Sequence, residues 1–457
     1  MRALLIPAAI LSLASLPASG QTLQEALALA YVNNPTLQAA RAGLRATDEN
    51  VPQALSGWRP TVQLSGNAGI AQGYSRSIGT TGPVTRETDR TPAGVTATVV
   101  QPLYRGGRTE AQVRRAENQV LAARARLLAA EQTVLRDTVA AYVAVIRDQE
   151  EVRLNGNNVT VLQRQLQATQ ERFRVGEITR TDVAQAESRL AGARAQLADV
   201  EGRLENSRSL FARLVGQAPR RLTSPQPLRA PVGSAEEARR IATANNPAVV
   251  AALFDEAAGR DFIDVQMAAL LPQANLQAQA FRNDNSSTPN TRITGQQLTA
   301  TLTVPLYQGG AEFSAVRQAR QDAQRLRQVI DEQRRLASQQ ASEAWESLLA
   351  TRATVASVRA QISAAEIALD GVRREAVVGN RTTLDVLNAE QELLNGRVAL
   401  VRVLANQVTA SHGLAAAVGR LTARDLRLPV DLHDMEAYYN AVRNRWAGLS
   451  DPIAPRN

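Results

Sequence analysis

The chain has 457 residues, of which 44% are hydrophobic and only 4% are aromatic. This alanine- and leucine-rich mixture favours long, closely packed helices over a sandwich or a doubly wound sheet. The absence of cysteine excludes disulfides, thiolate metal sites and cysteine nucleophiles. With only two histidines, His412 and His433, neither a zinc site nor a catalytic triad is expected, and nothing indicates a cofactor. The net charge of +9 comes from arginines dispersed among acids, which favours solvated helix faces over nucleic-acid binding.

The first 20 residues have the features of a secretory signal peptide. Arg2 supplies a positive start, residues 3–14 are apolar, and Ala18-Ser19-Gly20 offers small residues at a cleavage site. The mature chain is therefore expected to start at Gln21. No later run of about 18 apolar residues occurs, so a transmembrane helix is not expected and a membrane span would have to be a β-barrel.

The rest of the chain is an internal duplication, which is the main organising feature of the sequence. The segment Gln101–Gly107 recurs as Val304–Gly310, an offset of 203 residues, and residues 175–183 recur as 378–386 at the same offset. The expected segments are a signal peptide, a first repeat, a linker with a second repeat, and a tail, over residues 1–20, 21–222, 223–420 and 421–457.

Each repeat is expected to begin with a helix, which in the first repeat covers Thr22–Ser56 and restarts at Pro35 behind Asn34 as the N-cap. Two strands follow in each repeat and flank a variable loop. The loop of the first repeat, residues 73–91, is rich in Gly, Ser and Thr, and its partner is residues 283–295.

The four expected strands share one pattern. Uncharged polar and apolar residues alternate strictly in Gln273–Ala280 and Leu298–Val304, and more loosely in residues 62–70 and 95–99. A period of two with these two faces is typical of a strand with lipid on one side and water on the other. A half-buried sheet of a soluble protein shows the same pattern.

A very long helix is predicted next, from about Arg108 to Arg172. Apolar residues recur there every seven positions, with alanines between most of them, as in a coiled-coil seam. The seam residues are Val113, Val120, Leu127, Val134 and Ala141. A turn at Gly176 separates this helix from a second one, about Thr181–Leu214, and Gly379 marks the equivalent turn of the second repeat.

Helix lengths indicate the arrangement of each repeat. A helix of about 65 residues spans about 97 Å, which two shorter helices placed end to end would match. Each repeat is therefore expected to be a rod with strands at one end and the glycine turn at the other. Two repeats supply four strands, whereas single-chain barrels need at least about eight. A trimer with twelve strands is the simplest solution.

Five aromatic residues are expected near the two rims of such a barrel, where aromatic girdles meet the membrane surfaces. Trp58, Tyr104 and Tyr307 are assigned to the periplasmic rim, and Tyr74 and Phe281 to the opposite rim.

In these features the sequence resembles the TolC family of outer-membrane efflux proteins. The motifs that carry the resemblance are Asn33-Asn34-Pro35, Gly57-Trp-Arg-Pro60, the two Pro-Leu-Tyr-x-Gly-Gly segments and the two Val-Gly-x-x-Thr-x-x-Asp-Val segments. The resemblance implies a mainly α channel-tunnel with a β-barrel part, in which long antiparallel helical hairpins and four strands per protomer form a homotrimer. The twelve-stranded barrel would lie in outer-membrane lipid and the helical tunnel in the periplasm.

The family also implies partners and cargo. The protein would be the exit duct of a tripartite efflux or type I secretion system, docked to a periplasmic adaptor (membrane fusion) protein and an inner-membrane pump. The cargo would be drugs and other small toxic compounds, or secreted proteins. The alternative is a soluble periplasmic coiled-coil scaffold or pump adaptor, and an enzyme is not expected.

The resemblance further implies a gate at the glycine turns. The gate arginine resembles Arg381, its partners resemble Thr181 and Asp182 with Gln165 nearby, and the acidic ring resembles Asp385. Two departures from the family pattern occur. Asn388 replaces the second acid of the ring and Ala376 replaces the gate tyrosine, which leaves three acids per trimer and no tyrosine-mediated link. By themselves, Asp182 and Asp385 are more typical of acids that stabilise a helix start.

The tail carries Tyr438, Tyr439 and Trp446 but indicates no chemistry. It is expected to pack against the outside of the helices near the middle of the rod.

Overall fold

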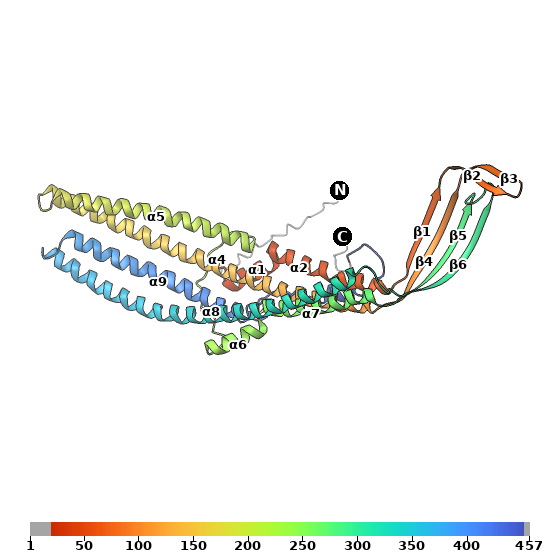
Figure 1. Ribbon diagram of the computed structural model, residues 1–457. Helices are drawn as coiled ribbons and strands as arrows, with labels where there is room; N and C mark the ends of the chain where they lie inside the picture. Colours follow the sequence, from red (N-terminus) through yellow and green to blue (C-terminus); the bar gives the residue numbers. More distant parts are fainter. Residues whose placement is uncertain (1–19, 452–457) are drawn as a thin grey trace, which may run out of the picture. The chain divides into compact units, whose positions relative to one another are not determined.

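The computed structural model describes residues 20–451, so the predicted signal peptide lies outside the described residues apart from Gly20. The two repeats fold with a similar order of elements, but the first contains an additional β-hairpin and one more short helix (Figure 1). The first repeat contains α1 (Leu23–Asn33), α2 (Pro35–Asp48), α3 (Asn50–Leu55), the short 3-10 helix η1 (Ser56–Trp58), β1 (Thr61–Ala68), β2 (Ala71–Gly79), β3 (Gly82–Arg90), β4 (Ala93–Arg105), α4 (Arg108–Arg174) and α5 (Arg180–Val215). The second repeat contains α6 (Ala235–Asn245), α7 (Pro247–Met267), η2 (Ala268–Leu270), β5 (Gln273–Asp284), β6 (Arg292–Thr303), α8 (Ala311–Val377) and α9 (Thr383–Ala417), and α10 (Ala437–Val442) lies in the tail.

The first predicted helix is divided into three pieces. Thr22 begins α1 with a reciprocal capping box to Glu25. Asn34 caps α2 as predicted, because its Oδ1 accepts a hydrogen bond from the Thr36 backbone N–H at 2.9 Å. Two prolines lie at the interruptions: Pro35 begins α2, and Pro52 lies in α3, where it lacks the N–H that would reach back one turn.

The four predicted strands form one antiparallel sheet in the order β1-β4-β5-β6. A row of paired residues crosses it, with Val62 opposite Val99, Val99 opposite Ala278, and Ala278 opposite Leu298. Opposed residues point to the same side, so the register confirms one apolar and one polar face. The apolar face holds Val62, Leu64, Val95, Ala97, Val99, Leu276, Ala278, Ala280, Leu298, Ala300 and Leu302. The polar face holds Gln63, Ser65, Thr96, Thr98, Asn275, Gln277, Gln279, Thr299 and Thr301.

The variable segment of the first repeat was expected to be a loop, and that expectation is wrong. Residues 71–90 form a separate two-stranded hairpin, β2–β3, paired from Ala71 opposite Arg90 to Gly79 opposite Gly82. Gly82 adopts φ of +115°, which a residue with a side chain rarely adopts, and so closes the tight turn. Threonine, valine and tyrosine in this segment supply the strand propensity that its glycines obscured.

The two long helices are equal in length. Both α4 and α8 contain 67 residues, and α5 and α9 contain 36 and 35. The predicted seam of α4 is largely confirmed, because Val120, Leu127, Val134 and Ala141 are buried while Val113 is half-buried. Within residues 20–451, no helix combines the length and the hydropathy needed to cross a membrane.

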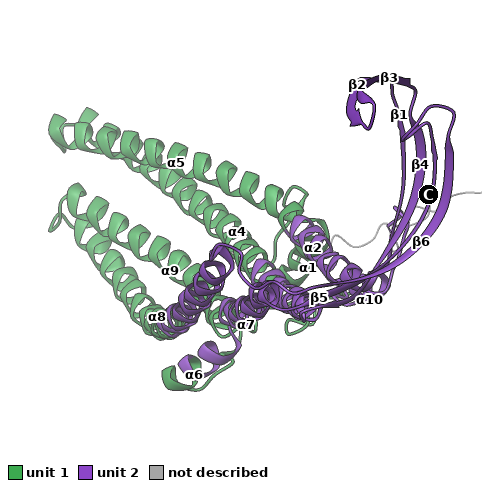
Figure 2. Ribbon diagram, turned by 45° about the vertical axis from the view of Figure 1, so that its right-hand side comes forward, with its two compact units in different colours: residues 1–36, 131–238, 341–432 green, residues 37–130, 239–340, 433–457 purple. Residues whose placement is uncertain are grey.

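The chain divides into two compact units, each of which combines segments of both sequence repeats (Figure 2). Among the described residues, unit 1 comprises residues 20–36, 131–238 and 341–432, which include the ends of α4 and α8 that precede the glycine turns. Unit 2 comprises residues 37–130, 239–340 and 433–451, which include the strands.

The tail contributes to both units. Up to Leu432 it lies in unit 1, where the Ala423 N–H donates to Glu131 at 2.7 Å. In unit 2 the Tyr438 hydroxyl donates to Glu49 at 2.9 Å, and the Arg445 carbonyl accepts from Arg59 at 2.7 Å. Because Arg59 comes two residues before β1, the tail reaches farther along the helices than expected.

Candidate functional site

The two glycine turns have the same backbone geometry, although their side chains differ. Gly176 and Gly379 have φ of +75° and +82°. The Gly176 N–H donates to the Phe173 carbonyl at 3.0 Å, and the Gly379 N–H donates to the Ala376 carbonyl at 3.2 Å. The duplication is therefore preserved at the level of single hydrogen bonds.

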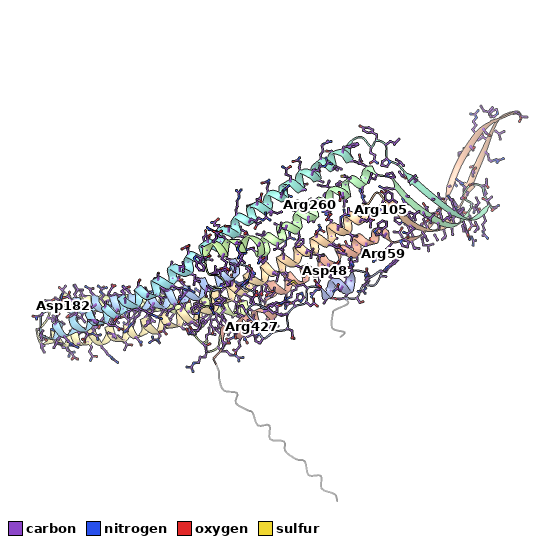
Figure 3. All side chains as sticks on the ribbon, turned by 90° about the horizontal axis from the view of Figure 1, so that it is seen from below. Asp48, Arg59, Arg105, Asp182, Arg260 and Arg427 are labelled. Carbon is purple, nitrogen blue, oxygen red and sulfur yellow. The ribbon has the colours of Figure 1, made fainter. Side chains whose placement is uncertain are left out.

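The predicted gate acids cap the helices that follow these turns. Asp182 accepts hydrogen bonds from the backbone N–H and hydroxyl of Thr179 at 3.0 and 2.7 Å, and Asp385 accepts the same pair from Thr382 at 3.0 and 2.8 Å. These bonds hold the pKa of both carboxyl groups below the usual range. Figure 3 shows Asp182 at the end of the helix pair in unit 1. Both acids thus stabilise the start of a helix, which is the role that their positions in the sequence favoured by themselves.

Arg381 pairs within its own turn. Its Nε lies 2.8 Å from Glu375 Oε2, so within this chain Glu375, rather than Asp182, is its ionic partner. The first repeat closes its turn with the charges reversed, through Arg172 and Glu177 at 2.7 Å.

The other predicted gate residues are distributed around the same end of unit 1. Thr181 is exposed beside Asp182, and Gln165 is half-buried on α4, where its backbone carbonyl accepts the Thr169 hydroxyl at 2.8 Å. Asn388, the departure from the family pattern, accepts a hydrogen bond from Arg189 of α5 at 2.8 Å. Next to this bond, Leu387 of α9 packs with residues of α4 and α5, namely Val159, Leu162 and Leu190.

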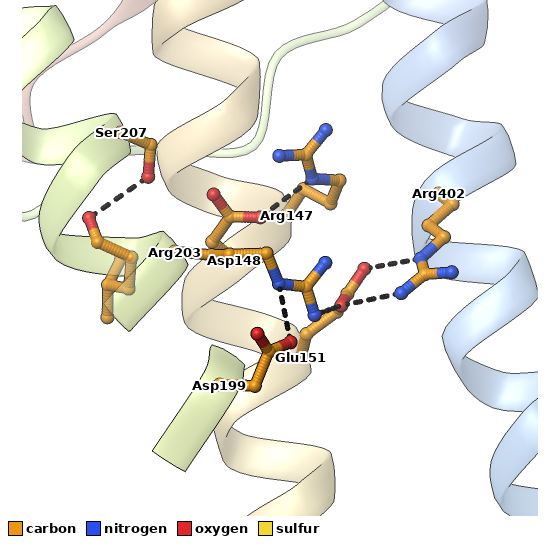
Figure 4. Close-up of polar contacts among 8 residues, drawn as sticks. Arg147, Asp148, Glu151, Asp199, Arg203, Ser207 and Arg402 are labelled. Atoms are coloured by element: carbon orange, nitrogen blue, oxygen red, sulfur yellow. Dashed lines mark hydrogen bonds and ion pairs between the residues drawn. The ribbon is translucent and has the colours of Figure 1, made fainter. Parts of the chain in front are cut away.

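Sequence reasoning missed an ionic cluster of unit 1 that is built on a buried acid and is shown in Figure 4. The Glu151 side chain on α4 is 1% exposed. It accepts two hydrogen bonds from Arg402 of α9, at 2.7 and 3.0 Å, and one from Arg203 of α5, at 2.9 Å. Burial raises the pKa of Glu151, but the two arginines outweigh burial and bring this pKa below its usual value. In the sequence Glu151 resembles its half-buried neighbour Glu150, and no local signal separates the two.

A groove of about 870 Å³ adjoins this cluster. It is lined by α4, α5 and α9, and its lining includes both Glu151 and Arg189. Unit 1 therefore contains two polar links between the α4–α5 hairpin and the α8–α9 hairpin. One link is formed by Glu151 and the other by Arg189, and both residues line one groove.

The five aromatics predicted for the two rims lie within or beside the strands, at different places. Tyr104 lies on the apolar face, opposite Ala274, at the end of the sheet that adjoins η1 and Trp58. Tyr307 follows β6 at the same end of its strand. Phe281 lies opposite Gly295 and therefore on the polar face with Gln279, so it does not face the same side as Leu298. Strict alternation from Gln279 could have revealed this placement.

The remaining aromatic, Tyr74, lies in the β2–β3 hairpin, opposite Glu87. It belongs to the smaller sheet and not to the four-stranded one.

The chain combines long helical hairpins with a sheet whose apolar face is exposed. This combination defines the class of membrane-channel protomers. The outer membrane efflux protein family matches residues 26–217 and 239–420. The chain is 36% identical to the outer membrane efflux protein BepC of Brucella suis over 440 residues, 95% of this chain and 93% of BepC. It is 25% identical to the outer membrane protein TolC of Vibrio cholerae over 423 residues, 89% of this chain and 92% of that protein.

A solved structure supports the fold. The CmeC outer membrane channel of Campylobacter jejuni superposes with a TM-score of 0.78 at 15% identity, over 92% of this chain and 89% of that chain. The chain belongs to the outer membrane efflux protein family, and the resemblance found in the sequence is confirmed. The outer membrane is accordingly its location.

Proposed function

We propose that the protein is the outer-membrane exit duct of a tripartite efflux or type I secretion system and acts as a homotrimer. The observation that carries this proposal is the four-stranded sheet. Its outer strands β1 and β6 each pair on one side alone within the described residues, and its apolar face is exposed. Leu64, Leu298 and Leu302 are 73%, 71% and 67% exposed, a state that a protein in water avoids in a contiguous patch.

Three copies would satisfy these unpaired edges. Pairing β1 of one protomer with β6 of the next closes a barrel and leaves no free edge, as a membrane-spanning sheet requires. Twelve strands then place the apolar face toward lipid and the glutamine- and threonine-rich face toward a water-filled lumen. In this orientation the helices lie in the periplasm.

The glycine turns would form the periplasmic entrance. In a ring of alternating hairpins, Arg381 of one turn lies near Asp182 and Thr181 of the next, and Asp385 contributes to a ring of acids. The entrance opens when a periplasmic adaptor and an inner-membrane pump dock, and the duct itself performs no chemical step. Arg381 needs only to exchange Glu375 for a neighbouring acid, which an exposed arginine does at small cost.

The proposal is tested in the source bacterium by deletion of the gene. The deletion strain is expected to become sensitive to several unrelated drugs or to retain a secreted protein in the cell, and a plasmid copy should restore the phenotype. Unchanged drug susceptibility together with unchanged secretion would contradict the proposed function.

A further inference from the structure

The carboxylate of Glu151 joins three helices. Arg203 reaches it from α5, the helix that forms the first hairpin with α4, and Arg402 reaches it from α9 of the second hairpin. The bond to Arg402 is bidentate, with both guanidinium contacts at 3.0 Å or less. Planar, charge-assisted pairs of this kind fix orientation as well as distance. Glu151 therefore fixes one point of α9 against the first hairpin.

The second hairpin is held together separately. Arg373 with Glu390, Arg397 with Glu366, and Gln361 with Glu392 join α8 to α9 at 2.8, 2.9 and 3.1 Å. None of these three links involves Glu151. The contacts of Glu151 therefore act between the two hairpins, at a different place from the contacts that hold α8 to α9.

The cluster occurs once in each protomer despite the duplication. At the offset of 203 residues, Glu151 corresponds to Thr354, Arg203 to Asn406, and Arg402 to Asp199. A trimer built from alternating hairpins has a contact between hairpins within each protomer and another between protomers. The residues at the second contact cannot reproduce the ionic cluster, because its acid is replaced by threonine and one of its arginines by asparagine.

We propose that Glu151 is a positioning residue of the gate, which clamps the second hairpin to the first within each protomer and thereby holds the tip closed. This proposal rests on the proposed duct function. Glu151 precedes the end of α4 by 23 residues, a distance of about 35 Å along the helix. If the contact at Glu151 breaks, a small rotation of α9 at that point produces a larger displacement at the glycine turns.

The location also explains why the clamp remains effective in the aqueous periplasm. Water and salt weaken an exposed ion pair, and here the Glu151 carboxylate is 1% exposed while Arg402 and Arg203 are 50% and 36% exposed. Arg189 and Asn388 add a second link between α5 and α9 closer to the turns, at 2.8 Å. Release of the second hairpin then requires both links to separate. The link at Glu151 is the more buried of the two.

Glu151→Gln in the full-length trimer, measured in planar lipid bilayers, tests the clamp. The neighbouring Glu150→Gln is the matched control, because Glu150 is 39% exposed and pairs with Arg153 on its own helix. Loss of the charged bidentate contact should raise the fraction of time in the open state by about tenfold or more. Glu150→Gln should match the wild type. An unchanged Glu151→Gln channel, or equal effects of both variants, would overturn the proposal.

A second arm protects the test from simple misfolding. Gly192→Cys on α5 and Asn395→Cys on α9 both line the groove beside Glu151, the chain has no other cysteine, and a side chain at Gly192 meets open space. A short bismaleimide bridge between them should return the Glu151→Gln channel to wild-type closure. A bridged channel that stays open would overturn the clamp. Glu151→Asp, which keeps the charge, should open less than Glu151→Gln.

The same cysteine pair separates the clamp from the duct function. Should wild-type trimers fail to conduct under any condition, the duct function would be contradicted. The yield of bridging would still report the clamp, because Glu151→Gln should change this yield and Glu150→Gln should not. Equal yields in both variants would overturn the clamp alone.

Discussion

Replacement of Asp48 by asparagine should stabilise unit 2 at neutral pH. Asp48 is the last residue of α2, and its side chain is fully buried, with both carboxylate oxygens lacking a hydrogen-bond partner. Burial raises the pKa of Asp48 to about 6, although the charge of Arg124 opposes this shift and that of Glu49 adds to it. Figure 3 shows the position of Asp48 among the helices of unit 2.

The size and pH dependence of the effect follow from this shift. A rise from 3.8 to about 6 is roughly two pKa units. At about 1.36 kcal/mol per unit, the ionised group costs up to about 3 kcal/mol of folding free energy at pH 7. The folded state binds the proton more tightly than the unfolded state, so the favourable contribution is complete below about pH 4 and is lost as the pH rises through 6. Asparagine keeps two polar atoms buried, so a net gain of about 1–2 kcal/mol is expected.

Thermal unfolding in detergent, followed by circular dichroism between pH 4.5 and 8, measures this effect. Asp48→Asn should unfold at a higher temperature than the wild type at pH 8, and the difference should shrink toward pH 5. Asp331→Asn, at a 55% exposed acid of α8, is the control and should show neither change. A variant that is no more stable than the wild type at pH 8, or a difference independent of pH, would refute the electrostatic reasoning.

Three further predictions concern the sheet and the tip. Leu298→Arg places a charge in the middle of the apolar face and should cost about 2–4 kcal/mol, seen as poor trimer assembly in membranes, whereas Thr299→Arg on the polar face should assemble normally. Equal losses would show that the faces are wrongly assigned. Arg381→Ser should raise single-channel conductance in planar bilayers, because its ionic contacts no longer hold the turn; an unchanged conductance would leave Arg381 without a gating role. Asp385→Ala should weaken block by multivalent cations added at the periplasmic end, and undiminished block would place the constriction elsewhere.

Local patterns predicted much of the fold. The period of two in residues 273–280 specified β5 and its faces, and the seven-residue period specified α4, because each pattern depends on neighbours in the sequence. Asn34 was predicted as a cap and is one, since capping involves contacts with the next few residues.

Contacts between distant residues could not be predicted in this way. Arg402 is separated from Glu151 by 251 positions, and the heptad pattern does not indicate which arginine faces a buried acid. The partner of Arg381 was also missed, because Glu375 lies across a turn whose closure the sequence did not specify. The β2–β3 hairpin was missed because frequent glycine and serine resemble a loop when pairing is unknown.

The assembly state of the protein in its membrane tests the account most directly. The outer-membrane fraction, extracted in mild detergent, should contain the protein, and native mass spectrometry should give the mass of three chains. This result follows from the unpaired edges of β1 and β6, which a neighbouring copy must satisfy. Recovery of the protein from the periplasm as a soluble single chain would contradict the central claim.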